Sequence, residues 1–286
     1  MQTIDSLSAL ADKIDVFFID VYGVLWNGKA FYPKALEICQ DLIKQGKRIY
    51  ILSNATTIGA HFKEKHIGNG FLQGVHYTDV ITSGDVLKDK LEREDFLTQV
   101  AGSNKGKYLL IGLPNDRLLS SVLSRQTLNV DEAAVVYIGA LRTADYQYYE
   151  TLAPFLDLAQ KALNKKLPAI CSNPDYYAFH EKMKHVTSGL LGKWYEDHGG
   201  RVFWIGKPYH QIYDFALKVA NVSPSRAAMV GDTLRTDIMG GAKAEMTTVL
   251  ITQTGMTADE LSHGHTLSEL VKAEGVVPDY LLAQLQ

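Results

Sequence analysis

The amino-acid sequence predicts an α/β protein: a doubly wound, mainly parallel sheet of the Rossmann-like type, with a second α/β unit inserted into it. Short runs of β-branched and aromatic residues alternate along the chain with longer segments of helical periodicity. Such alternation favours right-handed crossovers and a parallel sheet that is covered by helices on both faces. Several of the short runs also end in a polar residue, as strands do at the ligand-binding edge of such sheets.

Nine apolar segments are predicted to be strands, because each is short and rich in strand-forming residues. Helices are expected between them. Residues 32–46 have apolar positions at helical spacing, with Pro33 near the start and Gly46 at the end. Residues 210–222 and 236–246 are also predicted to be helical. The predicted strands are 16–20, 48–53, 79–83, 107–112, 134–139, 167–172, 201–206, 227–232 and 247–252.

Four of these strands end in a side chain that can do chemistry. Asp20 ends the first, Ser53 ends the second, Lys207 follows the seventh and Asp232 ends the eighth. The carboxyl ends of parallel strands share one edge of the sheet, where ligands bind at the point at which the strand order reverses. We therefore expect these four residues, although distant in sequence, to lie around one site.

The strands between about residues 107 and 172 lack such a set of charged ends, and they are expected to form a separate unit. We predict a core made of residues 1–80 and 178–286, and an inserted α/β cap made of residues 81–177. A cap of this kind is expected to close over the strand ends, exclude water and select the substrate.

Composition limits the possible partners. The 286 residues carry a formal net charge of -3, so no global basic field would attract nucleic acid or an anionic membrane. The two cysteines, Cys39 and Cys171, have no metal-ligand spacing and fit a reduced, cytoplasmic protein. The apolar runs are shorter than the roughly 20 residues that a membrane helix needs. We expect a cytoplasmic protein without a membrane or nucleic-acid partner.

The converging residue types suit phosphoryl transfer. A phosphate ester is anionic, so an attacking aspartate approaches a like charge, and a divalent cation removes that repulsion. Mg²⁺ prefers hard oxygen ligands, which Asp20 and Asp232 can supply. Lys207 adds a positive charge for the phosphate, and Ser53 with the next backbone amide can bind another phosphate oxygen. Aspartate is also a competent covalent nucleophile.

Four motifs carry a family resemblance. The segments DVYGVLWNG, ILSN, IGKP and MVGDTLRTDI occur in this order, each at a predicted strand end. They resemble the ordered motifs of the haloacid dehalogenase (HAD) superfamily. The long segment between ILSN and IGKP, which contains CSNPD, resembles subclass IIA, the NagD-like and p-nitrophenylphosphatase-like sugar or nucleotide phosphatases with a large α/β cap. The resemblance implies Mg²⁺ as cofactor and a small phosphorylated metabolite as substrate, and homodimers formed through the cap are common among similar proteins.

Position by position, the resemblance assigns roles to residues of the phosphoryl site. Asp20 would be the nucleophile that forms an aspartyl-phosphate. Ser53 and the backbone amide of Asn54 would hold the transferred phosphoryl group, and Lys207 would bridge that group and Asp20. Ala55 departs from the closest relatives, which tend to have a second Asn there, and this change affects hydrogen bonding more than chemistry.

The resemblance also implies a metal site. Asp20 would bind Mg²⁺ through its side chain and Tyr22 through its backbone carbonyl, which does not depend on the side chain. Asp232 would bind the ion directly. Asp237, five residues further along, would act through water or by contacting the ligands.

Tyr22 departs from the family pattern, because phosphatases of this superfamily carry a second aspartate there as general acid and base. A phenol, with an ordinary pKa of about 10, can donate a proton but is a poor base near neutrality. Tyr22 would make turnover slow, or restrict it to esters whose leaving group needs little acid assistance.

Two alternatives stay open. The D-x-Y-G pattern also resembles the haloacid dehalogenases themselves, in which Asp20 would attack carbon without a metal, although the acids Asp232 and Asp237 have little use there. The other is a catalytically weakened protein that binds a phosphometabolite on the same fold. The CSNPD segment, 171–175, reads as a turn. By the resemblance it marks the return from cap to core, and Asp175 there could face the substrate.

Overall fold

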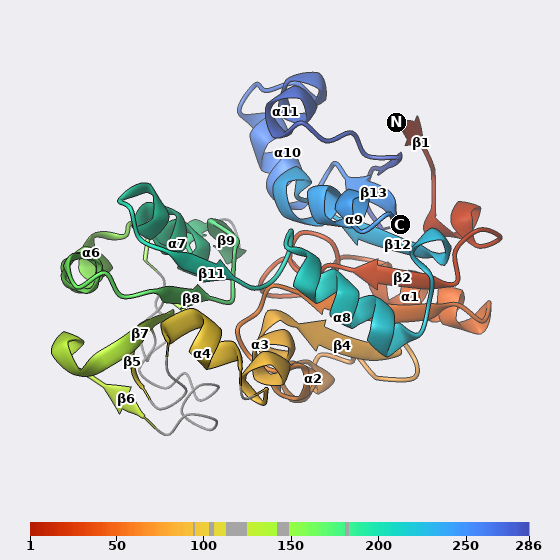
Figure 1. The fold of residues 1–286 in the computed structure, drawn as a ribbon. Helices are drawn as coiled ribbons and strands as arrows, with labels where there is room; N and C mark the ends of the chain where they lie inside the picture. Colours follow the sequence, from red (N-terminus) through yellow and green to blue (C-terminus); the bar gives the residue numbers. More distant parts are fainter. Residues whose placement is uncertain (94, 103–105, 113–124, 142–148, 181–182, 286) are drawn as a thin grey trace.

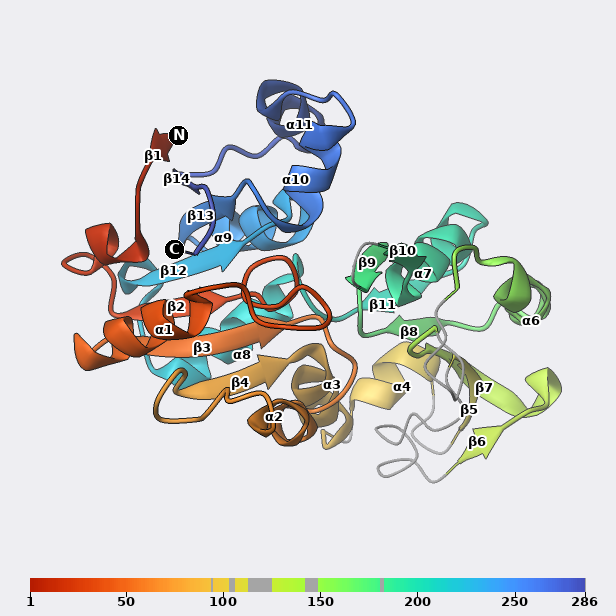
Figure 2. The same cartoon turned by 180° about the vertical axis from the view of Figure 1, so that it is seen from behind.

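The molecule contains two parallel sheets that lie side by side, with helices packed against both (Figures 1 and 2). A short antiparallel hairpin is formed by β9 and β10. None of the helices among the described residues is long and apolar enough to span a membrane. The computed structural model describes residues 1–93, 95–102, 106–112, 125–141, 149–180 and 183–285.

The larger sheet has seven strands in the order β1-β14-β13-β12-β2-β3-β4. Its strand order reverses at β2, which pairs with β12 on one side and β3 on the other, so the sheet is doubly wound as predicted. The bounds are β1 Gln2–Thr3, β2 Val16–Ile19, β3 Arg48–Ser53, β4 Asp79–Thr82, β12 Ala227–Gly231, β13 Thr247–Ile251 and β14 Tyr280–Leu282.

Side-chain alternation along β2 explains why helices cover both faces of this sheet. Val16 and Phe18 belong to a core with helices α3 and α8, whereas Phe17 and Ile19 belong to a second core with α1 and α2. All four side chains are fully buried, as expected for a central strand. The helices of this part are α1 Ala35–Lys44, α2 Gly59–Ile67, α3 Ser83–Leu91, α8 His210–Ala220, α9 Met239–Lys243, α10 Gly255–Ser262 and α11 Leu267–Glu274.

The smaller sheet has five strands in the order β11-β8-β7-β5-β6. Together with α4, α6, α7 and the β9–β10 hairpin it forms what we call the inserted unit. The bounds are α4 Phe96–Ala101, β5 Lys107–Ile111, β6 Gln126–Thr127, β7 Ala133–Ile138, α6 Ala153–Asn164, β8 Ala169–Cys171, β9 Tyr177–His180, β10 Met183–Val186, α7 Ser188–Asp197 and β11 Val202–Trp204.

The nine predicted strands are all present, and the predicted fold class is confirmed. The helices predicted at 32–46 and 210–222 correspond to α1 and α8, and the one at 236–246 corresponds to a π-helical turn, Leu234–Ile238, followed by α9. The strands that the sequence pattern missed, among them β1 and β6, are two to four residues long and too short for a periodic signal.

The predicted return to the core at residue 178 does not coincide with the division between the sheets. β11 pairs in parallel with β8, so that Phe203 lies beside Ile170, and α7 packs in the same apolar cluster as β8. A strand ladder of backbone hydrogen bonds therefore ties residues 202–204 to the inserted unit. We infer that this unit extends to β11 and that the chain re-enters the core at Ile205, with β4 and α3 belonging to the core.

Gly84, in the first turn of α3, offers a test of the packing behind the loop that follows β3. A Cβ at this position would lie 2.7 Å from the carbonyl carbon and oxygen of Thr57, which are backbone atoms and cannot rotate away. We expect Gly84→Ala to lower the free energy of unfolding by about 1–3 kcal/mol, the usual cost of overpacking. The measurement is the urea denaturation midpoint. The matched control is Gly68→Ala, because a Cβ on Gly68 meets nothing within 4 Å; equal midpoints would contradict this packing.

Candidate active site

The polar strand ends meet at a pocket of about 840 Å³ between the two sheets. Asp20 follows β2, Ser53 ends β3 and Asp232 follows β12, so three neighbouring strands of the large sheet deliver them to one edge. Lys207 reaches the site from the smaller sheet, three residues after the end of β11. The expectation that these four residues gather around one site is met, since all of them line the pocket.

Lys207 makes the central contacts of the site. Its Nζ lies 2.5 Å from Asp20 Oδ1 and 2.8 Å from Asp237 Oδ1, and it donates a hydrogen bond to the carbonyl of Leu52 at 2.9 Å. The Lys207 side chain is 2% exposed, so these partners replace its hydration. Burial by itself lowers the pKa of this ammonium, but the surrounding carboxylates outweigh it and hold the pKa well above its usual value.

Asp232 and Asp237 are held by backbone N–H groups, one from α10 and one from the turn that joins β12 to the π-helical segment. Asp232 Oδ2 accepts a hydrogen bond from the backbone N–H of Met256 at 2.6 Å. Asp237 Oδ2 accepts one from the backbone N–H of Thr233 at 3.2 Å. Gly23, with φ +83°, lies so close to Asp232 that a Cβ there would come within 2.7 Å of the Asp232 Cγ. Both the backbone conformation and the space require glycine at this position.

Burial and mutual repulsion act together on the carboxylates. Burial raises the pKa of Asp20 to about 7, and the charge of Asp237 adds to this effect, while Lys207 opposes it. Burial also raises the pKa of Asp232 well above its ordinary value, with the charges of Asp20 and Asp237 as further causes. The site thus holds more negative charge than its single buried lysine balances.

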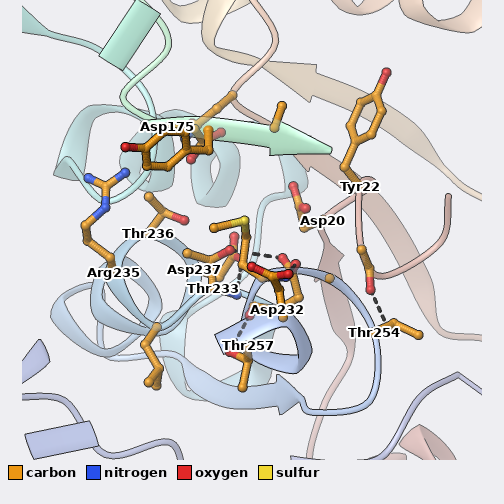
Figure 3. A pocket seen from close by; sticks show the side chains of 18 of the residues that line it. Asp20, Tyr22, Asp175, Asp232, Thr233, Arg235, Thr236, Asp237, Thr254 and Thr257 are labelled. Carbon is orange, nitrogen blue, oxygen red and sulfur yellow. Dashed lines mark hydrogen bonds between the residues drawn. The ribbon is translucent and has the colours of Figure 1, made fainter. Parts of the chain in front are cut away.

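These carboxylates fit a divalent cation. Asp20, Asp232 and Asp237 each offer an oxygen, and these oxygens lie within 4.8 Å of one another. Asp237 Oδ1 is buried and, among the described residues, makes no hydrogen bond; its contact with Lys207 is an ion pair without hydrogen-bond geometry. A set of oxygen donors with excess negative charge is what Mg²⁺ prefers. The acids predicted for the metal are therefore adjacent, as Figure 3 shows.

Asn54 has a structural task that the sequence did not reveal. Its side-chain oxygen accepts a hydrogen bond from the backbone N–H of Lys207 at 2.6 Å, and its Nδ2 donates to the Lys207 carbonyl at 3.0 Å. The same Nδ2 donates to Asp175 Oδ1 at 3.0 Å. Asn54 therefore ties the loop after β3 to the segments that follow β8 and β11. Ser53, next to it, is buried, and its Oγ accepts from the N–H of Ala55.

Tyr22 lines the pocket with its neighbours, but its ring extends away from the acidic group. In Figure 3 the hydroxyl lies at the end of the ring remote from Asp20, Asp232 and Asp237. The ring packs against the apolar core that contains Trp26. A packing role for the phenol agrees with this placement.

The inserted unit supplies one wall of the pocket, and sequence reasoning missed most of it. Tyr176, Tyr177 and Lys184 line it from the β9–β10 hairpin and the turn before it. Arg235 crosses from the core, with its guanidinium 3.6 Å from the ring centroid of Tyr176, and donates to the carbonyl of Pro174 at 2.8 Å. Only the segment CSNPD marked this wall in the sequence, through Asp175.

Comparisons with known proteins agree with this architecture. The family model of the haloacid dehalogenase-like hydrolases matches residues 14–245. A glycerol-3-phosphate phosphatase from Gallus gallus is 41% identical over an alignment 308 positions long, which covers 96% of this chain and 91% of that protein. The ribonucleotide monophosphatase NagD from Escherichia coli (strain K12) is 24% identical, with 85% of this chain and 89% of that protein covered.

Solved structures give the same result. The crystal structure of a haloacid dehalogenase-like hydrolase from Brucella suis 1330 matches with a TM-score of 0.83 and 26% identity, covering 99% of this chain and all of that one. The match extends across both sheets, and the resemblance seen in the four sequence motifs is confirmed. The chain belongs to the haloacid dehalogenase-like hydrolases, in the branch that includes NagD and 4-nitrophenylphosphatase.

Proposed function

We propose that this protein is a magnesium-dependent phosphatase that hydrolyses a small phosphate ester, a sugar phosphate or a nucleotide, through an aspartyl-phosphate at Asp20. The observation that carries the proposal is the contact of Lys207 with both Asp20 and Asp237 inside a pocket that also holds Asp232. Relatives named as a glycerol-3-phosphate phosphatase and a ribonucleotide monophosphatase support a small phosphorylated substrate.

The residues of the chain divide the work between them. Asp20 Oδ attacks phosphorus, and the ester oxygen leaves with the bonding electrons. Lys207 keeps Asp20 oriented and pairs with the transferred phosphoryl group. The hydroxyl of Ser53 and the backbone amide of Asn54 bind another phosphoryl oxygen. Water then attacks the phosphorus of the aspartyl-phosphate and releases inorganic phosphate, which restores Asp20.

The metal would be held by Asp20, Asp232 and Asp237 with the backbone carbonyl of Tyr22. Mg²⁺ at this site would neutralise the repulsion between the attacking carboxylate and the dianionic phosphate. Its charge would also oppose the burial that raises the pKa of Asp20 and of Asp232. Tyr22 supplies no carboxylate for proton transfer, so esters with a poor leaving group need an acid from elsewhere in the pocket.

Substitution of the nucleophile tests the covalent step. Asp20→Asn should lower kcat for p-nitrophenyl phosphate by about three orders of magnitude or more, because an amide does not attack phosphorus at a useful rate. Release of p-nitrophenolate in saturating Mg²⁺ measures it. Activity that survives in Asp20→Asn would contradict the mechanism.

Assays in the presence of a chelator distinguish phosphatase activity from dehalogenase activity. Excess EDTA should abolish p-nitrophenolate release by the wild-type protein. Chloride release from chloroacetate, measured in the same EDTA buffer, should stay at background. Chloride release in the presence of EDTA, abolished by Asp20→Asn, would instead support metal-free attack on carbon.

Metal binding can be tested without turnover. Mg²⁺ at 100 times its Kd should stabilise the folded protein by about 2.7 kcal/mol. This gain should appear as a rise in Tm by scanning calorimetry. Asp232→Asn should abolish the rise, because it removes one of the three clustered carboxylates. The matched control is Asp214→Asn on the exposed side of α8, which should keep it. A rise of equal size in both variants would place the ion elsewhere.

A further inference from the structure

The proposed reaction needs a proton at the leaving oxygen, and the pocket contains a carboxylate that no step above uses. Asp20, Asp232 and Asp237 form one cluster. Asp259 and Glu260 on α10 face Lys184 Nζ at 3.7 and 3.8 Å, and Glu274 lines the pocket from the end of α11. Among the described pocket residues contributed by the inserted unit, Asp175 is the one carboxylate. Figure 3 shows it on a different wall of the pocket from the acidic cluster.

The backbone of Asp175 is fixed from several sides. Its N–H donates to Asn173 Oδ1 at 3.1 Å, and its carbonyl accepts a hydrogen bond from the hydroxyl of Thr187. Gly189, in the first turn of α7, packs so closely that a Cβ there would overlap the backbone of Pro174 and Asp175. A side chain on such a segment is held in place before substrate arrives, as catalytic groups require.

The carboxyl group of Asp175 is joined to the reacting centre through two residues. Oδ1 accepts from Asn54 Nδ2 at 3.0 Å, the same Nδ2 donates to the carbonyl of Lys207, and Lys207 Nζ contacts Asp20. The other carboxyl oxygen of Asp175, Oδ2, takes no part in the hydrogen bond from Asn54. The residue is partly buried and lines the pocket.

The charges around Asp175 suit a group that gives and takes a proton. Burial raises its pKa, and the charge of Asp237 adds to the rise, while Lys207, Arg235 and the Asn54 hydrogen bond oppose it. A carboxylic acid with a raised pKa keeps a larger protonated fraction near neutrality than an ordinary aspartate does. Tyr22, the other candidate donor, directs its hydroxyl away from Asp20.

We propose that Asp175 is the proton-transfer residue of this site. As the bond from Asp20 Oδ to phosphorus forms and the bond from phosphorus to the ester oxygen breaks, the Asp175 carboxyl gives its proton to the leaving oxygen. In the second step the Asp175 carboxylate takes a proton from the water that attacks phosphorus, and Asp20 leaves with its electron pair. The inference rests on the proposed phosphatase function.

The test compares two esters of similar shape, p-nitrophenyl phosphate and phenyl phosphate. p-Nitrophenolate leaves as a stable anion, whereas phenolate needs more help from an acid. Asp175→Asn is the variant, because the Asn oxygen can still accept the Asn54 hydrogen bond while the proton is lost. We expect kcat/KM to fall by about 10² or more for phenyl phosphate and by less than about fivefold for p-nitrophenyl phosphate.

The second step gives a separate signature. Loss of the base should slow hydrolysis of the aspartyl-phosphate, so Asp175→Asn should show a burst of p-nitrophenolate of about one equivalent followed by a low kcat. Introducing a carboxylate by Tyr22→Asp into Asp175→Asn should recover part of the activity on phenyl phosphate. The matched control is Asp157→Asn on α6, whose side chain is 81% exposed, and both esters should be hydrolysed as by wild type.

The possible outcomes distinguish a failure of the role proposed for Asp175 from a failure of the proposed phosphatase function. Equal losses for both esters without a burst would mean that Asp175 only supports the structure, and would overturn the inference. The same holds if Asp175→Asn behaves as wild type, or if Tyr22→Phe shows the leaving-group dependence instead. A wild-type protein that hydrolyses neither ester in Mg²⁺ would contradict the proposed function itself, whereas the losses described above in an active protein would support both.

Discussion

The buried ammonium of Lys207 between the carboxylates of Asp20 and Asp237 is the interaction around which the two sheets are arranged. Removing one partner from a buried ion pair leaves a bare charge and costs about 3–5 kcal/mol. Because Lys207 follows a strand of one sheet and Asp20 a strand of the other, the pair also joins the two parts of the molecule. Asn54 reinforces the junction by binding both backbone groups of Lys207.

The same arrangement leaves an imbalance of charge. One lysine lies among three clustered carboxylates. Burial, together with the charges of the neighbouring acids, raises the pKa of Asp20 and of Asp232, and Asp237 keeps a buried oxygen without a hydrogen bond among the described residues. Burying this cluster of carboxylates lowers the stability of the folded protein. Binding of a cation and a phosphate together can offset that loss. The features that destabilise the resting site are thus those that the proposed chemistry needs.

Sequence patterns predicted the sheet and the convergence of Asp20, Ser53, Lys207 and Asp232, because strand ends in a parallel sheet share an edge whatever their order in the chain. The same patterns could not locate the end of the inserted unit. β11 is a three-residue strand, and only its pairing partner decides which sheet it joins. The hydrogen bonds that Asn54 makes to Asp175 and to Lys207 were also hidden, because contacts between residues so distant in sequence leave no periodic signal.

The placement of β11 has a mechanical consequence. Only Ile205 and Gly206 separate the last residue of this strand from Lys207, and Gly206, at φ +116°, is enclosed by Ser83, Asn54 and Pro174. Because this connection is short and closely packed, Lys207 has little freedom to move independently of β11. A rotation of the five-stranded sheet away from the larger one would pull on the lysine directly, and swinging the sheet back would return the ammonium to Asp20. Admission of a ligand and assembly of the charge that holds it would then be a single movement.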